Sequence, residues 1–323
     1  MTKKKVLLTI NPMLLESRRF STMRRLIRWL DRCCDLRLVP VSGYDFKRGR
    51  VTTYRRRPDG SFEKMRHSSV PRADLWIVYS DGFYLDPRAF GFKLRRDYLQ
   101  AQLAFHEEQL RMETVRVMIN SPEAEARTLK SWLATLDFQS SRVIPTYLFS
   151  GITEVYDLQR ARGTIVAKLN WGGANLGVER LRSESCVREF ERRLKECADR
   201  DLSDYCFQPY CRGEEKRFWF AGGKCLAARV IHGRETPWSG MRDNFRVAAY
   251  DADGSAAFAR DLSAARRLIE RAGIDVGSVD FIGSRINEVN GGGTVLTTYC
   301  FDKMVIDVRP AFLQYIQSLL HAL

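Results

Sequence analysis

Residues 279–290, with the sequence VDFIGSRINEVN, constrain the fold more than any other stretch of the chain. Strand-forming residues on both sides of a short Gly-Ser turn predict a β-hairpin. Because alternate residues of a strand point to the same face, Glu288 and Asn290 are expected side by side. With Asp280 from the neighbouring strand, they would supply three oxygen ligands of the kind that Mg²⁺ prefers. The segment alone leaves a second interpretation open, a hairpin with polar residues on its solvated face.

The composition is typical of a globular protein. The chain has 323 residues, 45% of them hydrophobic, which is enough to build two or three compact units. No run approaches the roughly 18 apolar residues of a membrane span, and the first five residues lack the apolar region of a signal peptide, so we expect a cytoplasmic protein without membrane contacts. The eight cysteines and four histidines show no zinc-ligand spacing, and we expect the cysteines to be reduced.

Positive charge is concentrated in the first third of the chain. Residues 1–100 carry 23 Lys and Arg against 10 Asp and Glu, a net charge of +13, whereas residues 101–323 carry 30 against 29, a net charge of +1. Such a field favours an acidic partner, which could be a polycarboxylate, a phosphorylated molecule, an acidic peptide or nucleic acid. A purely solubilising surface is the alternative.

The first 120 residues alternate between strand and helix patterns. Strands are expected at KKVLLTI, LRLVPV, residues 73–80 and residues 115–120, with helices after Ser21 and over residues 95–110. This order predicts a doubly wound parallel sheet whose active edge lies at the carboxyl ends of the strands. Residues 50–66 predict an arginine-rich hairpin turned at Pro-Asp-Gly, which could reach over a site like a flap.

Two lysines stand out in the middle of the chain. Ser121 and the proline after it predict the start of a helix that carries Lys130. Lys168 ends a predicted strand and is followed by a loop with three glycines at residues 172, 173 and 177. The loop is neither a Walker loop nor a GxGxxG motif, but its backbone N–H groups could close over phosphates. Glycines that serve only the turn are the alternative.

Several arginines recur at strand spacing in the last third of the chain. The period-two pattern around Arg217 and Arg229 can turn both side chains inward, where they need anionic partners because an unpaired buried charge is costly. Arg242, Asn244 and Arg246 show the same spacing. An apolar-striped helix is expected over residues 309–323.

The order of these parts resembles the ATP-grasp superfamily, most closely bacterial glutathione synthetase and the ribosomal-protein glutamate ligases. The resemblance rests on a helix lysine, a strand lysine before a glycine loop, FQPY, GEEKR, an AAR strand, an RDN loop and VDFIG followed by NEVN. It implies an α/β (α+β) protein: two α+β ATP-grasp subdomains preceded by an α/β pre-ATP-grasp domain with a mainly parallel sheet. The expected boundaries are 1–118 for the basic first domain, 119–207 for the subdomain with the glycine loop, and 208–323 for the subdomain with the metal-binding hairpin.

The resemblance also implies roles for individual residues. Two Mg²⁺ ions, or Mn²⁺ in their place, would be bound by Asp280, Glu288 and Asn290. Arg217 and Arg229 would act near the transferred phosphate, and substrate contacts are expected from Arg229, Arg242 and Asn244. Contacts to ATP are expected from Lys130, Lys168, Gly172, Gly173, Gln208, Tyr210, Cys211 and Glu215, with residues 208–211 around the adenine and Glu215 near the ribose.

Ligases of this superfamily join a carboxylate to an amine. The carboxylate attacks the γ-phosphate of ATP to give an acylphosphate, and the amine then displaces phosphate to form an amide. Two anions meet in the first step, so surrounding cations stabilise it and no nucleophilic side chain is required. This agrees with the low histidine content. The resemblance therefore implies a C–N bond-forming ligase of the acid–amino acid class.

The sequence departs from glutathione synthetase near the substrate. Residues 291–293 are three glycines where that enzyme has a Thr/Ser/Pro-rich turn, Pro237 and Trp238 stand in a loop that is small and polar there, and the arginine-rich hairpin has no counterpart. Glutathione is therefore not the expected product. An amino acid, a peptide or a natural-product intermediate is expected instead, with acidic carboxylate and amine substrates.

Two further hypotheses stay open at this point. One is a ligase acting on a protein or peptide chain held by the basic first domain. The other is a nucleotide-binding regulatory module without ligation. The resemblance also implies a homodimer or homotetramer, and a nucleic-acid partner is not expected.

Overall fold

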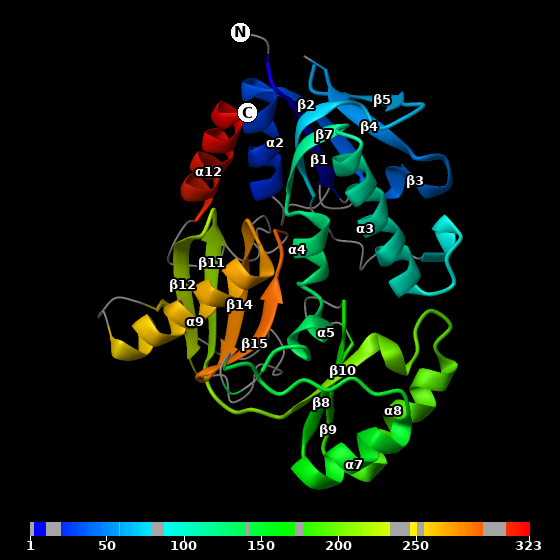
Figure 1. Ribbon diagram of the computed structural model, residues 1–323, viewed down its shortest axis with the longest axis vertical. Coiled ribbons are helices and arrows are strands. Elements are labelled where there is room, and N and C mark those ends of the chain that lie inside the picture. The colour runs from blue at the N-terminus through cyan, green and yellow to red at the C-terminus, as the bar shows by residue number, and fades with distance from the viewer. Residues whose placement is uncertain are drawn as a thin grey trace.

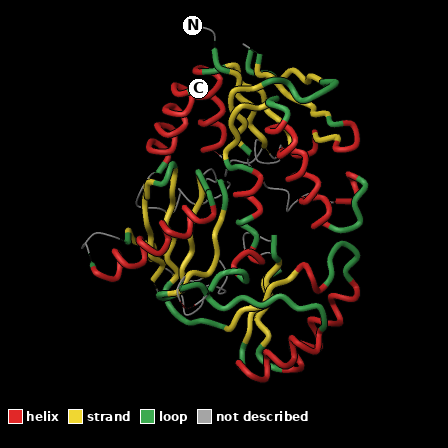
Figure 2. Tube along the Cα trace, viewed as in Figure 1, coloured by secondary structure: helices red, strands yellow, loops and turns green. Residues whose placement is uncertain are grey.

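A computed structural model describes residues 3–10, 21–57, 59–78, 87–137, 139, 142–171, 177–232, 246–250, 255–292 and 308–323. These residues form three β-sheets, one at the top of Figure 1 and two below it. Helices and loops surround the sheets, as the tube in Figure 2 shows. The mixed α/β class predicted from the sequence is confirmed. Among the described residues, no helix combines the length and the apolar character that crossing a membrane would require.

The first sheet has a parallel centre. Strand β1 pairs in parallel with β2 and β6, and β6 pairs in parallel with β7, while β3 and β5 pair antiparallel with β4. The strand order is β3-β4-β2-β1-β6-β7, with β5 attached to β4. The elements are β1 (Lys5–Ile10), α2 (Ser21–Cys33), β2 (Asp35–Pro40), β3 (Tyr44–Asp45), β4 (Arg50–Arg56), β5 (Phe62–Arg66), β6 (Ala73–Ile77), α3 (Arg95–Arg111) and β7 (Val115–Ile119).

The C-terminal helix α12 (Arg309–Ala322) returns to this sheet. Phe312 and Ile316 of α12 share a buried core with Leu26 and Leu30 of α2, and the two helices lie side by side in Figure 1. The same core continues into the lower sheet through Trp219. Helix α12 therefore packs in a core that joins the first sheet to the third.

The second sheet is small and antiparallel, in the order β10-β8-β9. Its apolar core combines the strands with two helices that lie against them at the bottom of Figure 1. Ser183 caps the second helix by accepting a hydrogen bond from the Cys186 backbone N–H at 3.4 Å. The elements are α7 (Ile152–Arg162), β8 (Ile165–Leu169), β9 (Val178–Leu181), α8 (Glu184–Glu196) and β10 (Tyr205–Pro209).

The third sheet is fully antiparallel, in the order β13-β12-β11-β14-β15. The predicted hairpin over residues 279–290 is its β14–β15 pair, turned at Gly283, whose φ of 59° suits a residue without a Cβ. Helix α9 begins at a Ser255 cap and covers one face of the sheet. The elements are β11 (Glu215–Ala221), β12 (Lys224–His232), β13 (Arg246–Ala249), α9 (Ala256–Ala272), β14 (Val276–Ile282) and β15 (Arg285–Asn290).

One helix that we predicted as continuous is broken in the structure. The sequence predicts a single helix from Ser121 past Lys130, and Ser121 does cap a helix, but the structure breaks it into α4 (Pro122–Ala126) and α5 (Lys130–Leu133). The reason is tertiary: the Lys130 N–H donates to the Asn170 carbonyl at 3.0 Å, and the Ser131 N–H donates to the Asn170 side chain at 2.6 Å. These bonds replace helical ones and place Lys130 beside the end of β8.

Candidate active site

A row of charged side chains crosses the third sheet at one level. In the strand registers Arg217 is opposite both Arg229 and Asp280, and Asp280 is opposite Glu288. Residues that pair across antiparallel strands share a face, so β12, β11, β14 and β15 together present two cations followed by two carboxylates. Asn290 joins the row, because its amide nitrogen lies 3.4 Å from both Asp280 Oδ2 and Glu288 Oε1.

The structure thus brings together the three predicted metal ligands. Asp280 is only 3% exposed, so the alternative of a hairpin with solvated polar residues does not describe it. Its two carboxylate oxygens accept hydrogen bonds from Nε and Nη2 of Arg217, a bidentate pair. Among the described residues, no three or more His, Cys, Asp or Glu side chains lie together so that they could hold a metal ion. The predicted ligand set has only two carboxylates, and its third member is the Asn290 amide.

The two predicted lysines face this row from other parts of the chain. Lys130 Nζ of α5 lies 3.8 Å from Glu288 Oε2. Lys168 of β8, which is 2% exposed, donates from Nζ to Asn287 Oδ1 at 2.5 Å. Buried ammonium groups are stabilised by such partners. The second and third sheets therefore meet where these lysines approach β15.

Asn287 reaches Lys168 because of a β-bulge. The β14–β15 register passes from Asp280 opposite Glu288 to Phe281 opposite Ile286, which leaves Asn287 as an extra residue without a partner in the ladder. A bulge re-aims a side chain that regular alternation would send elsewhere. Asn287 was not predicted from the sequence, since strand periodicity contains no signal for the bulge.

Burial shifts the pKa values of these groups. It lowers the pKa of Lys168 to about 8, although the nearby Glu288 carboxylate acts in the opposite direction. Burial raises the pKa of Asp280 against the lowering effect of Arg217. Burial also acts to raise the pKa of Glu288, but Lys130 and Lys168 outweigh it and the net shift is downward. Negative charge in the row is therefore held most firmly on Glu288, facing the lysines.

The predicted adenine linker lies next to the lysines. Gln208 is buried at the end of β10 and donates from Nε2 to Thr146 Oγ1 at 2.9 Å and to the Asn287 carbonyl at 3.4 Å. The guanidinium of Arg180 stacks over the Tyr210 ring at 4.6 Å. Neither Thr146 nor Arg180 was predicted from the sequence.

Two further predicted residues, Cys211 and Glu215, come after Tyr210 in the chain. The Cys211 thiol is 3.7 Å from the Pro209 carbonyl. Glu215 pairs with Arg229 at 3.6 Å, so this carboxylate faces the row of charges.

Four predicted residues lie outside the described residues: Gly172, Gly173, Arg242 and Asn244. Pro237, Trp238 and Gly293 also lie outside them. The first two glycines after Asn290 are described, and a Cβ on Gly291 would come within 2.6 Å of Glu125 Oε1. Close packing on α4 thus explains a residue without a side chain at position 291.

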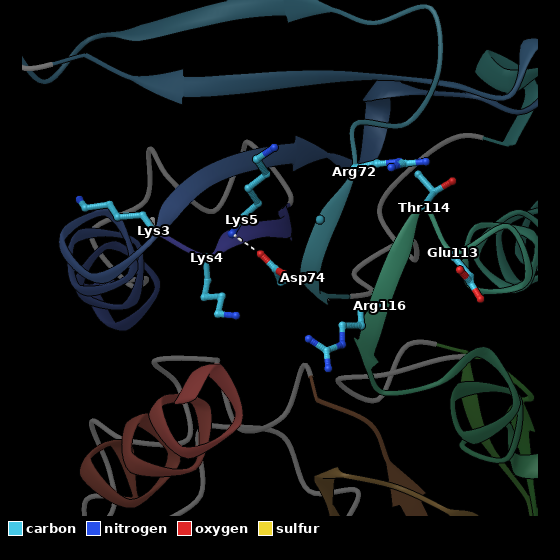
Figure 3. A pocket seen from close by; sticks show the side chains of 9 residues that line it. Lys3, Lys4, Lys5, Arg72, Asp74, Glu113, Thr114 and Arg116 are labelled. Atoms are coloured by element: carbon cyan, nitrogen blue, oxygen red, sulfur yellow. Dashed lines mark hydrogen bonds between the residues drawn. The ribbon is translucent and has the colours of Figure 1, made fainter. Parts of the chain in front are cut away.

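A second group of charged side chains lies on the first sheet. A hollow of about 430 Å³ at the amino ends of β1, β6 and β7 is lined in part by Lys4, Asp74 and Arg116. Figure 3 shows that its cationic side chains point in different directions, with Lys5 and Arg116 on opposite sides. The row on the third sheet, where charges converge, is therefore the candidate active site.

Solved structures with the same architecture are known, although no protein-family model and no curated protein sequence matches this chain. The ATP-grasp ligase PsnB, solved in complex with a minimal precursor, is 16% identical, with 99% of each chain covered and a TM-score of 0.61. D-alanyl-alanine synthetase A from Vibrio cholerae is 13% identical over 99% of each chain, with a TM-score of 0.61. The D-cycloserine synthetase DcsG is 17% identical over 98% of this chain and 99% of its own, with a TM-score of 0.62. The resemblance inferred from the sequence motifs is confirmed at the level of architecture, and the chain has the fold of the ATP-grasp ligases.

Proposed function

We propose that this chain is an ATP-dependent ligase that joins a carboxylate to an amine through an acylphosphate. The observation that carries the proposal is the row Arg229, Arg217, Asp280 and Glu288, faced by Lys130 and Lys168. A row of cations and carboxylates with two lysines facing it suits the meeting of a triphosphate with a second anion.

The residues present fit Mg²⁺ and ATP. Two carboxylates and an amide oxygen are hard donors of the type that Mg²⁺ takes, and bound Mg²⁺ would neutralise phosphate charge. Structures of PsnB contain Mg and ADP. Lys130 and Lys168 would hold the phosphates, and Gln208 and Tyr210 would line the adenine side, with Cys211 and Glu215 at its margins. The proposal includes two Mg²⁺ ions, or Mn²⁺ in their place, and the closure of residues 172 and 173 over the phosphates.

Arg217 would change partners during the cycle. Its guanidinium is bound to both oxygens of Asp280. Release of Arg217 would free both Asp280 oxygens for a metal ion, and the transferred phosphate or the substrate carboxylate would offer the guanidinium another anionic partner. Arg229, opposite Arg217 in the register, would support the same charge. Arg242 and Asn244 remain proposed substrate contacts.

The proposed substrates are an acidic carboxylate and an amine on an amino acid, a peptide or a natural-product intermediate. A peptide or protein chain is the second candidate, and the charge of +13 over residues 1–100 favours it. The structures of PsnB contain a minimal precursor or the precursor peptide PsnA2. The proposed assembly of the protein is a homodimer or a homotetramer.

An ADP-release screen over acids paired with amines, with mass spectrometry of the products, tests the proposal. The expected result is ADP formation that requires both substrates and yields a product heavier by the amine minus water. Glu288→Ala should abolish it. ATP binding without turnover on any pair would instead indicate a nucleotide-binding regulatory module, and unchanged ADP release in Glu288→Ala would show the metal role to be wrong.

A further inference from the structure

Strand β5 is an edge strand of the first sheet. It pairs with β4 from Thr52 opposite Arg66 to Arg56 opposite Phe62, and within the described residues it pairs with no other strand. In Figure 1 it lies at the outer margin of the sheet. Its side chains are largely exposed, with Phe62 at 43%. The outer edge of β5 therefore presents backbone donors and acceptors that could pair with another strand.

One face of β5 carries cations at strand spacing. Lys64 is opposite Tyr54, and Tyr54 packs against the core that includes α2, so Phe62, Lys64 and Arg66 share the α2 face. Alternate residues of a strand stand about 6.8 Å apart. An added strand with acidic residues at every second position would match this spacing.

Lys64 and Arg66 belong to a strongly basic segment of the chain. Residues 47–72 carry nine Lys and Arg against two Asp and Glu. Three of the arginines pair with carboxylates: Arg55 with Asp35, Arg56 with Asp31 and Arg57 with Glu63, at 3.6, 3.3 and 3.8 Å. For Lys64 and Arg66 the described part of the chain offers no carboxylate within ion-pair distance. The edge strand itself thus keeps uncompensated positive charge.

The positive charge of Lys64 and Arg66 determines which kind of strand can pair with the outer edge of β5. A second copy of β5 would set Lys64 and Arg66 against like charges, which is unfavourable across a strand pair. An anionic strand gains both the backbone hydrogen bonds and the ion pairs. We propose that β5 binds an acidic segment of an extended peptide by strand addition, with its carboxylates facing Lys64 and Arg66. The proposal goes beyond the ligase function and requires no nucleotide.

Fluorescence anisotropy with the full chain tests this without ATP. The probe is a short labelled peptide of alternating glutamate and threonine. We expect binding that weakens as salt is added. The double variant Lys64→Glu/Arg66→Glu should lose about tenfold or more in affinity, because two attractions become repulsions. The matched control reverses Arg162 on α7 and Arg188 on α8, which are exposed and change the net charge equally; this variant should bind as the unchanged protein does.

Two further probes separate strand addition from simple charge attraction. The same peptide with N-methylated amides along one edge keeps its charge but loses the donors for the ladder, and it should not bind. Equal binding of the methylated peptide, or unchanged binding by the double variant, would overturn the proposal. So would binding of a single-stranded oligonucleotide through Lys64 and Arg66 with no binding of the peptide, since it would identify nucleic acid as the occupant. Because both side chains are exposed, the double variant should fold, and its circular dichroism spectrum checks this.

Discussion

The ammonium of Lys168 on β8 donates to the side-chain oxygen of Asn287 on β15 at 2.5 Å, and this bond joins the second and third sheets inside the candidate site. It exists because Asn287 is the extra residue of a bulge next to Glu288. Under the proposed function the two sheets would hold ATP between them, which would require their facing side chains to stay in register. The bond is thus a direct reporter of how the two sheets are positioned.

A double-mutant cycle measures that bond. Asn287→Ala leaves a buried ammonium with one acceptor fewer, so the free energy of unfolding should fall by about 1–3 kcal/mol. Lys168→Met should be destabilising too, but the two losses should not add in the double variant, with a coupling of about 1 kcal/mol in urea unfolding. Strict additivity of the two changes would mean that the residues do not interact in solution.

The carboxylate of Glu288 should be responsible for the Mg²⁺ dependence of ATP binding. Glu288→Gln keeps the shape of the side chain but removes the charge that faces Lys130 at 3.8 Å. We expect Mg²⁺ to tighten ATP binding to the unchanged protein in isothermal titration calorimetry and to have about tenfold less effect on the variant. Glu270→Gln, on the exposed side of α9, is the matched control. An equal Mg²⁺ effect in Glu288→Gln and Glu270→Gln would remove Glu288 from the metal site.

Buried His106 should make the protein less stable at acid pH. Its Nε2 is 3.0 Å from the Tyr44 hydroxyl, and burial lowers its pKa to about 3. The unfolded chain takes up this proton near pH 6.5, whereas the folded chain does so only near pH 3. The free energy of unfolding therefore falls as the pH drops through this window, by up to about 1.4 kcal/mol per pH unit.

His106→Gln tests this by urea unfolding at several pH values. The variant should show a shallower pH slope than the unchanged protein. Burial also lowers the pKa of His67, whose Nε2 is 2.7 Å from the Thr53 hydroxyl, but this residue is only partly buried, so His67→Gln should change the slope less. A slope in His106→Gln as steep as in the unchanged protein would assign the effect to other groups.

Two arginines of α3 connect this helix to residues that flank strands β8 and β10 of the second sheet. Arg96 pairs with Asp201 at 2.8 Å, and the guanidinium of Arg95 stacks over the Trp171 ring at 4.9 Å. Arg96→Glu should loosen this contact and raise hydrogen exchange around residues 199–204 by about fivefold, which corresponds to about 1 kcal/mol. The swap Arg96→Glu/Asp201→Arg should restore protection. Failure of the swap while each single variant exchanges faster would show that the ion pair itself is not the connection.

Strand periodicity and the resemblance predict most of the charged row. Alternation alone places Glu288 beside Asn290, and the hairpin adds Asp280, because these follow from local geometry. Periodicity also turns Arg217 inward, but its bidentate bond to Asp280 depends on which strands are neighbours, which the local pattern does not contain.

Other features depend on tertiary contacts and could not be predicted. The break between α4 and α5 is caused by Asn170, about 40 residues further along the chain, and the orientation of Asn287 is caused by a bulge. The sequence of residues 121–136 is compatible with one continuous helix, so the competing hydrogen bonds decide its shape.

Transfer of an isotopic label tests the proposed chemistry most directly. The acid found in the ADP-release screen is labelled with heavy oxygen in its carboxylate, and the phosphate released during amide formation is analysed by mass spectrometry. Attack of the carboxylate on the γ-phosphate places a carboxylate oxygen in the acylphosphate bridge, and displacement by the amine leaves that oxygen on the phosphate. We expect one labelled oxygen in the released phosphate for each amide formed. Amide formation with unlabelled phosphate, or with AMP and pyrophosphate as products, would contradict it.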